Sequence, residues 1–322
     1  MKILIIRLSS IGDIVLTTPV VRCLAKQVKD VELHYVCKPM YADLLKNNPY
    51  IDHVHVFDKK DKKSLEKLID NQFDYIIDLQ RNFYSRKISR KLGAIRTSFP
   101  KINLKKWILV NFKINLMPDI HVVDRYFEAV KHLNVSSDGE GLDYFISDAE
   151  KQEFSTLGLP SNYVAVALGS KHKTKQIPQD KLLSICKEIH LPLVLLGDHN
   201  DNTIAEFLQV NLKEKVYNLC GKLSLTLSAV CVQQAECILT GDTGLMHIAS
   251  AFQQKIVSVW GNTVPAFGMY PYMPKHRDKY VIIENKELYC RPCSKLGYKQ
   301  CPLGHFKCMN DVSTEEIVKH IN

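Results

Sequence analysis

The sequence of 322 residues has no long hydrophobic segment. The longest run without a charged residue, 256–274, contains two glycines and three prolines and would make a poor membrane helix. The apolar stretch 3–6 is followed at once by Arg7, so it is too short for the core of a signal peptide. These absences predict a cytoplasmic protein without a membrane-spanning segment.

Two common classes of binding motif are also missing. The first loop expected between a strand and a helix, residues 8–13, lacks the G-x-G-x-x-G pattern of dinucleotide-binding folds. No RNP, KH or zinc-finger pattern occurs, so we do not expect a nucleic-acid partner. A dinucleotide-dependent oxidoreductase and a non-catalytic binder of membranes or nucleic acid stay as rival interpretations.

Acidic residues are absent from 81–118. The formal net charge of the chain is +9, and this segment alone holds ten Lys or Arg residues, at positions 81, 86, 87, 90, 91, 96, 101, 105, 106 and 113. The rest of the chain is therefore close to neutral. A single basic segment of this kind indicates an anionic partner.

Large apolar residues lie among the lysines of 105–114. This pattern resembles an interfacial element that binds an anionic membrane surface, here the inner leaflet. Two other interpretations are open. Phe83, Tyr84 and Trp107 could stack on bases of a nucleic acid, or the segment could be a solvated face with an apolar stripe turned to the core.

Strand and helix patterns alternate along the chain, which predicts parallel sheets covered by helices on both faces. Strands are expected at 2–6, 31–37, 53–57, 73–79, 163–168, 191–196, 216–219, 237–240 and 256–260. Helices are expected at 18–28, 41–47, 64–71, 122–133, 180–189, 203–210, 225–233 and 245–251. A linker at 157–162 predicts an α/β protein of two Rossmann-like, doubly wound domains, 1–157 and 158–322, with ligands bound in a cleft between them.

Asp13 ends the first loop, at the carboxyl edge of the first predicted sheet. It could act as a general base, or it could simply cap a helix, for which Asp is a favoured residue. In the second half, the loop 169–178 carries Lys175 and the hydroxyl of Ser170 among further Lys and His side chains. Such a loop could bind a phosphate group, or it could be a solvated charged turn.

The stretch GDTGLMHIAS, 241–250, follows an apolar strand and opens a predicted helix. Asp242 or Thr243 can cap this helix, and Gly244 adds an unshielded amide where helix N-termini favour a diphosphate. His247, one turn later, could reach the same anion or pack as a structural residue. An acid in one domain and a phosphate site in the other indicate transfer from a nucleotide-activated donor to an acceptor hydroxyl.

Four of the ten cysteines gather near the carboxyl terminus. Cys290 and Cys293 form a C-x2-C pair, and Cys301 and Cys308 follow after seven and six residues. Such a set could hold a structural zinc ion, although the second pair lacks the usual spacing. We assign these cysteines no catalytic role.

Four stretches resemble the bacterial ADP-heptose:lipopolysaccharide heptosyltransferases, a GT-B glycosyltransferase family, and most closely its heptosyltransferase II-like branch. They are KILIIRLSSIGDIVLTTPVVRCL, DYIIDLQRNFYS, GDTGLMHIASAF and CRPCSKLGYKQCPLGHFKCMNDVSTEEI, in the family's order. The resemblance implies an inverting heptosyl transfer from ADP-heptose to the inner core of lipopolysaccharide, carried by a lipid-linked anionic acceptor. It also implies an enzyme peripheral on the inner membrane face, with no cofactor and no catalytic metal.

Residue by residue, the resemblance makes Asp13 the catalytic base and Lys175 the contact to the donor phosphates. Further donor contacts are implied at Ser170, Leu223, Asp242, Thr243, Gly244 and His247, and acceptor contacts at Ser10, Gly12, Arg81 and Asn82. The family's Lys-x-Trp-Pro motif reads Lys175-Gln-Ile-Pro178 here, so Ile177 replaces an indole that packs in the donor loop.

Overall fold

The computed structural model describes residues 1–61 and 63–322. Contacts divide them into two compact units: unit 1 holds residues 1–101 and 120–145, and unit 2 holds 102–119 and 146–322. The division predicted after residue 157 differs from this one. Helix α7 (Asp148–Ser155) contacts helix α10 (Leu225–Gln234), and Phe154 and Leu157 pack on a core cluster of unit 2.

Unit 1 is built on a five-stranded parallel sheet in the order β3-β2-β1-β4-β5. Its strands are β1 (Lys2–Ile6), β2 (Glu32–Cys37), β3 (His53–Val56), β4 (Tyr75–Asp78) and β5 (Ile95–Ser98). Its α-helices are α1 (Ile11–Val15), α2 (Thr18–Gln27), α3 (Lys63–Ile69), α4 (Phe83–Leu92) and α6 (Val122–Phe127). The chain order reverses between β1 and β4, and that switch point is where doubly wound sheets bind ligands.

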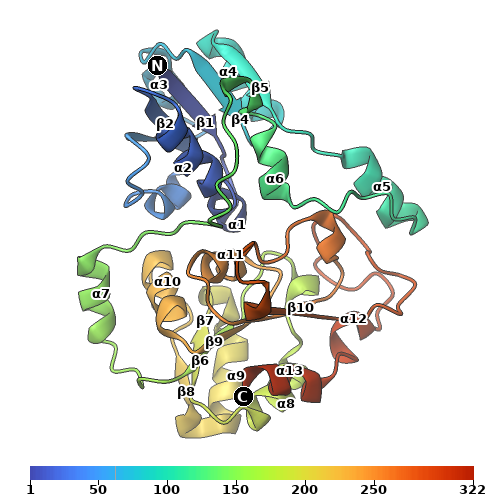
Figure 1. Cartoon of the computed structure of the whole chain (residues 1–322). Helices are drawn as coiled ribbons and strands as arrows, with labels where there is room; N and C mark the ends of the chain where they lie inside the picture. Colours follow the sequence, from blue (N-terminus) through green and yellow to red (C-terminus); the bar gives the residue numbers. More distant parts are fainter. Residues whose placement is uncertain (62) are drawn as a thin grey trace. The chain divides into compact units, whose positions relative to one another are not determined.

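The central strand β1 is buried on both sides, because Ile3, Leu4, Ile5 and Ile6 are all inaccessible to solvent. Leu4 and Ile6 share a core cluster with residues of α3 and α4. Side chains alternate across a strand, so Ile3 and Ile5 face the other side. Helix α2 contacts β2 and α6 there, and Figure 1 shows α2 beside these strands.

Unit 2 has a six-stranded parallel sheet in the order β11-β10-β9-β6-β7-β8. From its other edge this is the Rossmann order, with the switch point between β6 and β9. The strands are β6 (Val164–Ala167), β7 (Leu193–Leu196), β8 (Val216–Asn218), β9 (Cys237–Gly241), β10 (Ile256–Trp260) and β11 (Tyr280–Glu284). Besides α7 and α10, the helices are α5 (Asn103–Phe112), α8 (Gln179–Glu188), α9 (Asn202–Leu212), α11 (Gly244–Ala251), α12 (Lys307–Asn310) and α13 (Thr314–Ile321).

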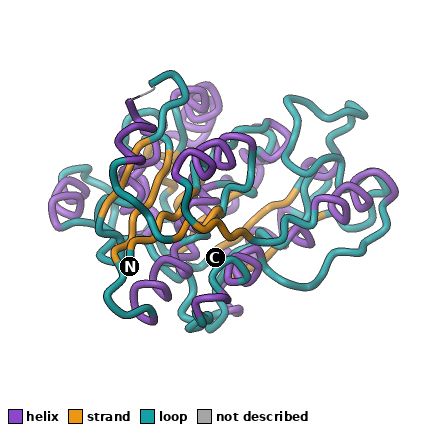
Figure 2. The backbone as a smooth tube through the Cα atoms, turned by 90° about the horizontal axis from the view of Figure 1, so that it is seen from above, coloured by secondary structure: helices purple, strands orange, loops and turns teal. Residues whose placement is uncertain are grey.

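Alternate residues of β6 separate the two cores of unit 2. Val164 and Val166 pack with side chains of α8, α9 and α13, whereas Ala165 and Ala167 pack with side chains of α10 and α11. Figure 2 shows the strands flanked by helices in this way. The predicted α/β fold with two doubly wound sheets is confirmed.

Two predicted helices were wrong in detail. The stretch expected as one helix at 122–133 is α6 followed by a short 3-10 segment, Lys131–Leu133. The helix expected at 41–47 is a 3-10 segment, Pro39–Leu44, because Pro39 fixes the first turn and the segment is too short to continue.

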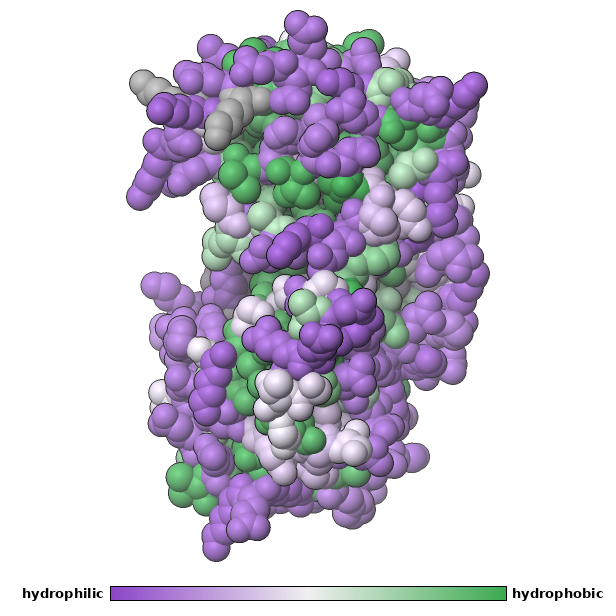
Figure 3. All heavy atoms as spheres, turned by 90° about the vertical axis from the view of Figure 1, so that its left-hand side faces the viewer, coloured by the Kyte–Doolittle hydropathy of each residue, from purple (hydrophilic) through white to green (hydrophobic). Residues whose placement is uncertain are grey.

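Within the described ranges, no helix combines the length and the apolar character needed to cross a bilayer. The face drawn in Figure 3 carries mainly hydrophilic side chains, with apolar ones in smaller groups between them.

Candidate active site

The predicted site residues fall into two sets, one in each unit. Each set lies at the carboxyl ends of strands, beside a switch point except for Leu223, which follows the edge strand β8. Unit 1 carries Ser10, Gly12, Asp13, Arg81 and Asn82, and unit 2 carries Ser170, Lys175, Leu223, Asp242, Thr243, Gly244 and His247.

Asp13 lies in the first turn of α1 and is held from two sides. Its Oδ2 accepts hydrogen bonds from the backbone N–H of Ser10 (3.2 Å) and from the Ser10 hydroxyl (2.9 Å). Its Oδ1 lies 2.5 Å from Nη2 of Arg7, a side chain that is 8% exposed, while the Asp13 side chain is 22% exposed. Asp13 is therefore fixed in orientation and still reachable by a substrate. The capping role is confirmed, because this carboxylate completes the helix start, and the general-base role stays a prediction.

Arg7 is fixed by its own set of acceptors. Its Nη1 donates to the carbonyl of Leu79 (2.5 Å) and to the Tyr126 hydroxyl (3.1 Å), and its Nε donates to Ser9 O (2.9 Å). Burial alone would raise the pKa of Asp13, but the Arg7 charge and the two bonds from Ser10 outweigh burial and hold that pKa below 3.8. Asp13 is thus an ionised carboxylate at neutral pH.

The loop after β4 is organised by a buried carboxylate that the sequence reasoning missed. Asp78 is fully buried, and its oxygens accept from the backbone N–H of Arg81 (2.6 Å), the Ser85 hydroxyl (2.8 Å) and Arg96 (2.6 Å). Asn82 caps α4 by accepting from Ser85 N (2.9 Å). This loop holds two of the four predicted acceptor contacts: Asn82 caps α4, and Arg81 Nη1 donates to Phe99 O (2.8 Å).

A basic cavity of about 520 Å³ opens beside this loop. We call it the arginine pocket. It is lined by Arg81, Arg86, Ser89, Arg90, Gly93, Ala94, Arg96 and Ser98. Four guanidinium groups and no carboxylate belong to its lining, and Asp78 compensates only Arg96. Such a cavity suits an anion, because guanidinium groups bind phosphate and carboxylate with paired hydrogen bonds.

In unit 2, an ion pair joins the loop after β6 to the loop after β9. Lys175 Nζ lies 2.5 Å from Oδ2 of Asp242, and these side chains are 16% and 12% exposed. The Thr263 hydroxyl donates to the same Oδ2 (2.9 Å). A Cβ on Gly241 would stand 2.4 Å from the Lys175 carbonyl, so only glycine allows the two loops to approach this closely.

Helix α11 begins directly after this pair. Its N-cap, Thr243, makes no capping bond with its side chain, because its hydroxyl pairs with that of Thr240 (3.0 Å). The backbone donors of the first turn, starting at Gly244, are thus not covered by their cap residue, and they lie at the positive end of the helix dipole. His247 is buried, at 2% exposure. The arrangement can receive a diphosphate.

The family model of glycosyltransferase family 9 (heptosyltransferase) matches residues 62–306. The chain belongs to this family of glycosyltransferases. A relative of family 9, lipopolysaccharide heptosyltransferase 1 of Campylobacter coli, is 29% identical over 349 residues, which cover 99% of this chain and 97% of the relative. Lipooligosaccharide heptosyltransferase 2 of Haemophilus ducreyi is 23% identical and covers 100% and 99%.

Solved structures of family 9 share the fold, and this chain's fold is that of GT-B heptosyltransferases. The ADP-heptose lipopolysaccharide heptosyltransferase II of Escherichia coli aligns with a TM-score of 0.76 at 18% identity, covering 100% of this chain and 98% of that one. A family 9 glycosyl transferase from Veillonella parvula aligns with a TM-score of 0.80 at 22% identity, covering 99% and 95%. Relatives numbered 1 and 2 both occur, so the heptosyltransferase II-like branch stays a prediction.

The loop after β6 departs from the Lys-x-Trp-Pro pattern at Ile177, and the structure shows where that side chain packs. Ile177 is 6% exposed and belongs to the core cluster that includes Val166 and Leu182. Ile177 therefore anchors the loop in the hydrophobic core, while the Lys175 side chain pairs with Asp242. Leu223, a predicted nucleoside contact, is half-buried against the other core.

Asp201 and Thr263 are residues that the sequence reasoning missed. Asp201 is 4% exposed, and a Cβ on Gly169 would meet its Oδ2 at 2.4 Å, so this carboxylate lies against the loop that carries Ser170. It accepts from the backbone N–H of Asp198 (2.9 Å). The sequence offered one signal for Asp201: an acidic residue four positions after Gly197, which directly follows the buried strand β7.

The cysteine-bearing tail braces the loops near Asp242 and Lys175. Arg291, 8% exposed, donates to the carbonyls of Gly261 (2.5 Å) and Thr263 (3.0 Å) and pairs with Glu284 (2.8 Å). These bonds hold the segment 261–263, and the Thr263 hydroxyl of this segment in turn donates to Asp242.

A second tail contact holds the lysine loop. The backbone N–H groups of Thr174 and Tyr298 are bound reciprocally, the first by Tyr298 O (3.2 Å) and the second by the Thr174 hydroxyl (2.8 Å). Thr174 directly precedes Lys175, so the tail holds the Lys175 loop as well as the segment next to Asp242.

The four tail cysteines carry free thiols in this structure. No three of Cys290, Cys293, Cys301 and Cys308, all within the described ranges, bring their sulfur atoms within 4.8 Å of one another. The charge of the Cys308 thiol nevertheless interacts with those of Cys290, Cys293 and Cys301, and the zinc site of the tail stays a prediction.

Proposed function

We propose that the chain is an inverting heptosyltransferase that moves a heptose from ADP-heptose to a hydroxyl of the inner core oligosaccharide of lipopolysaccharide. The observation that carries the proposal is Asp13: an ionised, partly exposed carboxylate at the switch point of unit 1 in a family 9 chain. The relatives are heptosyltransferases of lipopolysaccharide and lipooligosaccharide, which supports the choice of sugar and acceptor class.

In the proposed reaction, the acceptor oxygen forms a bond to the anomeric carbon while the bond from that carbon to the donor phosphate oxygen breaks. Asp13 takes the proton of the acceptor hydroxyl, and ADP leaves with the electron pair. Lys175 and the first turn of α11 stabilise the negative charge on the departing diphosphate. Because these groups supply positive charge at the leaving group, we expect no cofactor and no catalytic metal.

Arg7 makes Asp13 a weak base, and the reaction can accommodate this. The acceptor hydroxyl becomes strongly acidic only once its oxygen has begun to bond to the anomeric carbon, so proton transfer is needed late. A rigid carboxylate in the right orientation then serves better than a more basic but mobile one. Arg7 and Ser10 provide that orientation.

We assign the arginine pocket to an anionic group of the acceptor. Among the described residues, Arg86 and Arg90 make no ion pair and no side-chain hydrogen bond, so both guanidinium groups are available to a ligand. The Arg86→Gln/Arg90→Gln variant should raise the KM for a phosphorylated lipid-linked acceptor at least about tenfold, since each charge-assisted bond contributes roughly 1.5–3 kcal/mol. Initial rates at saturating donor measure this.

The matched control is Lys87→Gln/Lys91→Gln, which removes two exposed charges from the same helix outside the pocket. It should change the KM for the acceptor much less. An equal rise in both variants would reduce the effect to general charge steering and contradict the assignment. The affinity for ADP should be unchanged in each.

We propose that α5 is the membrane-facing element of the basic segment. Leu104 and Trp107 on α5 are 70% and 49% exposed, with Lys105 and Lys106 beside them. By contacts α5 belongs to unit 2, where Lys113 Nζ donates to Cys290 O (3.2 Å) and Pro292 O (2.8 Å). The basic segment 81–113 is thus divided between the two units.

Leu104→Ser/Trp107→Ser should weaken binding to vesicles containing anionic lipid by about tenfold or more, because two large side chains lose their transfer into the interface. Cosedimentation measures this binding. Val210→Ser, which removes a 76% exposed side chain from α9, is the control. Equal binding by all three proteins would remove α5 from this role.

Calorimetry with ADP, ADP-heptose, UDP, GDP and NAD tests the donor assignment. Binding of ADP and ADP-heptose without added metal is the expected result. A preference for UDP or GDP would keep the mechanism and overturn the heptose. Binding of NAD alone would favour the oxidoreductase, and binding of none would favour the non-catalytic surface binder.

A further inference from the structure

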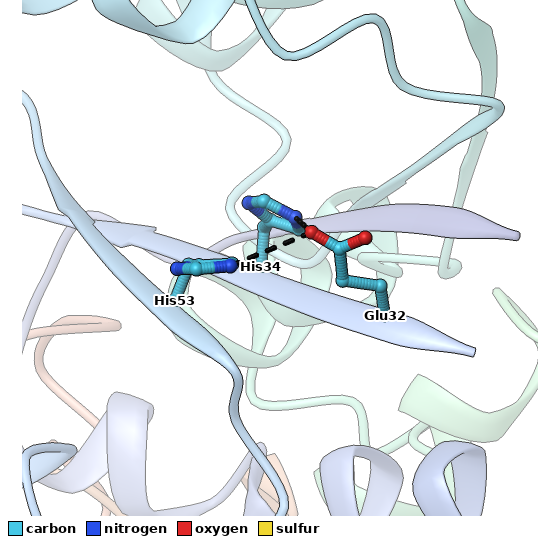
Figure 4. Close-up of side chains that lie close together, drawn as sticks. All are labelled: Glu32, His34 and His53. Atoms are coloured by element: carbon cyan, nitrogen blue, oxygen red, sulfur yellow. Dashed lines mark hydrogen bonds and ion pairs between the residues drawn. The ribbon is translucent and has the colours of Figure 1, made fainter. Parts of the chain in front are cut away.

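Three side chains that no step of the proposed reaction uses meet at one edge of the sheet in unit 1. His34 of β2 and His53 of β3 are register partners, and Glu32 precedes His34 by two residues, so all three project from the same face. Glu32 Oε1 lies 2.9 Å from His34 Nε2 and 3.4 Å from His53 Nε2. Figure 4 shows both rings turned toward this oxygen.

The His34 ring is held in place from behind. Its second nitrogen, Nδ1, lies 2.8 Å from Nε2 of His55, and Phe73 packs edge-on against it with ring centroids 5.0 Å apart. A histidine that binds a metal through one nitrogen typically hydrogen-bonds through the other, which fixes the tautomer and the ring orientation. His55 occupies that supporting position.

We propose that Glu32, His34 and His53 bind a divalent transition-metal ion of the Zn²⁺ type through one carboxylate oxygen and two imidazole Nε2 atoms. All three ligand atoms lie within 4.8 Å of one another, the one such group of His, Cys, Asp and Glu among residues 1–61 and 63–322. Zinc bonds of about 2.0–2.2 Å in a tetrahedron place ligand atoms roughly 3.3–3.5 Å apart. Glu32 Oε1 lies 2.9 Å from His34 Nε2 and 3.4 Å from His53 Nε2, so only the first distance must lengthen slightly to fit a zinc ion.

The partners of the two His34 nitrogens suit the ligand role, because Nε2 lies 2.9 Å from Glu32 Oε1 while Nδ1 lies 2.8 Å from His55 Nε2. On metal binding, the proton on His34 Nε2 is replaced by the ion, and Nδ1 carries the proton that is donated to His55. Lys2 Nζ, 3.7 Å from Glu32 Oε1, sits on a side chain that is 42% exposed and can turn to solvent.

The location argues for a structural ion. Glu32 and His53 open their strands, whereas Asp13 follows the carboxyl end of β1, so the three ligands lie toward the opposite edge of the sheet. β3 is an edge strand and His53 is 57% exposed, which gives an ion access and leaves a coordination position for water. The ion would join β3 to β2.

Titration of chelator-treated full-length protein with Zn²⁺ and with Co²⁺ tests the proposal. One Zn²⁺ per chain should bind, at least about tenfold more weakly in His53→Ala and about tenfold more weakly in His55→Ala. The control His132→Ala removes an exposed ring that lies tilted against Tyr75 of the same unit, and it should bind Zn²⁺ like the unchanged protein. The Co²⁺ form should show weak d–d bands without an intense thiolate charge-transfer band.

Three results would overturn the proposal: no zinc binding, equal affinity in His53→Ala, or a thiolate band that accounts for all bound Co²⁺. The last would place the ion on the tail cysteines instead. Because His53 is exposed, its loss should leave the fold intact, and circular dichroism checks this.

Discussion

Asp13→Ala is expected to lower turnover at least about a hundredfold while ADP binding is largely kept, because the variant removes the proposed base and leaves the donor residues of unit 2 untouched. Asp13→Asn should be as slow, since an amide can still accept the Ser10 bonds but cannot take a proton. Steady-state rates and ADP calorimetry on both variants give the two quantities.

A structural effect must be separated from a chemical one here. Either variant leaves the buried Arg7 without its carboxylate, which can cost about 3–5 kcal/mol of stability. Thermal unfolding therefore accompanies the kinetics, at a temperature where each variant is folded. Near-normal turnover in a folded variant would remove Asp13 from the role. Because the pKa of Asp13 lies below 3.8, the unchanged enzyme should not lose this base until the pH falls below that value.

Lys175→Ala is expected to weaken ADP binding about tenfold or more. The variant removes a charge-assisted contact of roughly 1.5–3 kcal/mol, and it also leaves the Asp242 carboxylate uncompensated where the diphosphate must sit. Lys173→Ala, which removes an exposed lysine from the same turn, should have a much smaller effect on ADP binding. Calorimetry measures the ADP affinity of the unchanged protein, of Lys175→Ala and of Lys173→Ala.

The double variant Lys175→Ala/Asp242→Asn separates the two causes. If repulsion by Asp242 contributes, the double variant should bind ADP more tightly than Lys175→Ala alone. The asparagine can still accept from Thr263, so the loop keeps that contact. An ADP affinity that does not change in Lys175→Ala would count against the phosphate assignment altogether.

The sequence was most informative where strands are buried on both faces. The runs around β1, β6, β9 and β10 are apolar and bounded by turns, and each was predicted close to its observed bounds. The strands β5 and β11 were missed, although the edge strands β3 and β8 were predicted; β5 reads Ile-Arg-Thr-Ser, with its first two residues exposed. A half-polar strand of four residues carries too weak an alternation to be seen.

The chemistry of the site was only half visible in the sequence. The types and positions of Asp13, Lys175 and Asp242 followed from motifs, but their partners did not. Arg7 meets Asp13, and Lys175 meets Asp242, through contacts that depend on which strands are neighbours. Spacing along the chain does not encode such pairs. The same limit explains why α5 was read with 81–101, although it packs with unit 2.

The bracing of the donor loops by Arg291 and Tyr298 bears on the order in which the enzyme becomes competent during synthesis. Unit 1 ends at residue 145, so all of its strands and its base have been made while unit 2 is still being translated. Strands β6 to β10 follow, yet their loops lack two anchors until the tail emerges. A chain that stops before residue 291 therefore lacks both the Arg291 and the Tyr298 contacts that hold the loops of Asp242 and Lys175.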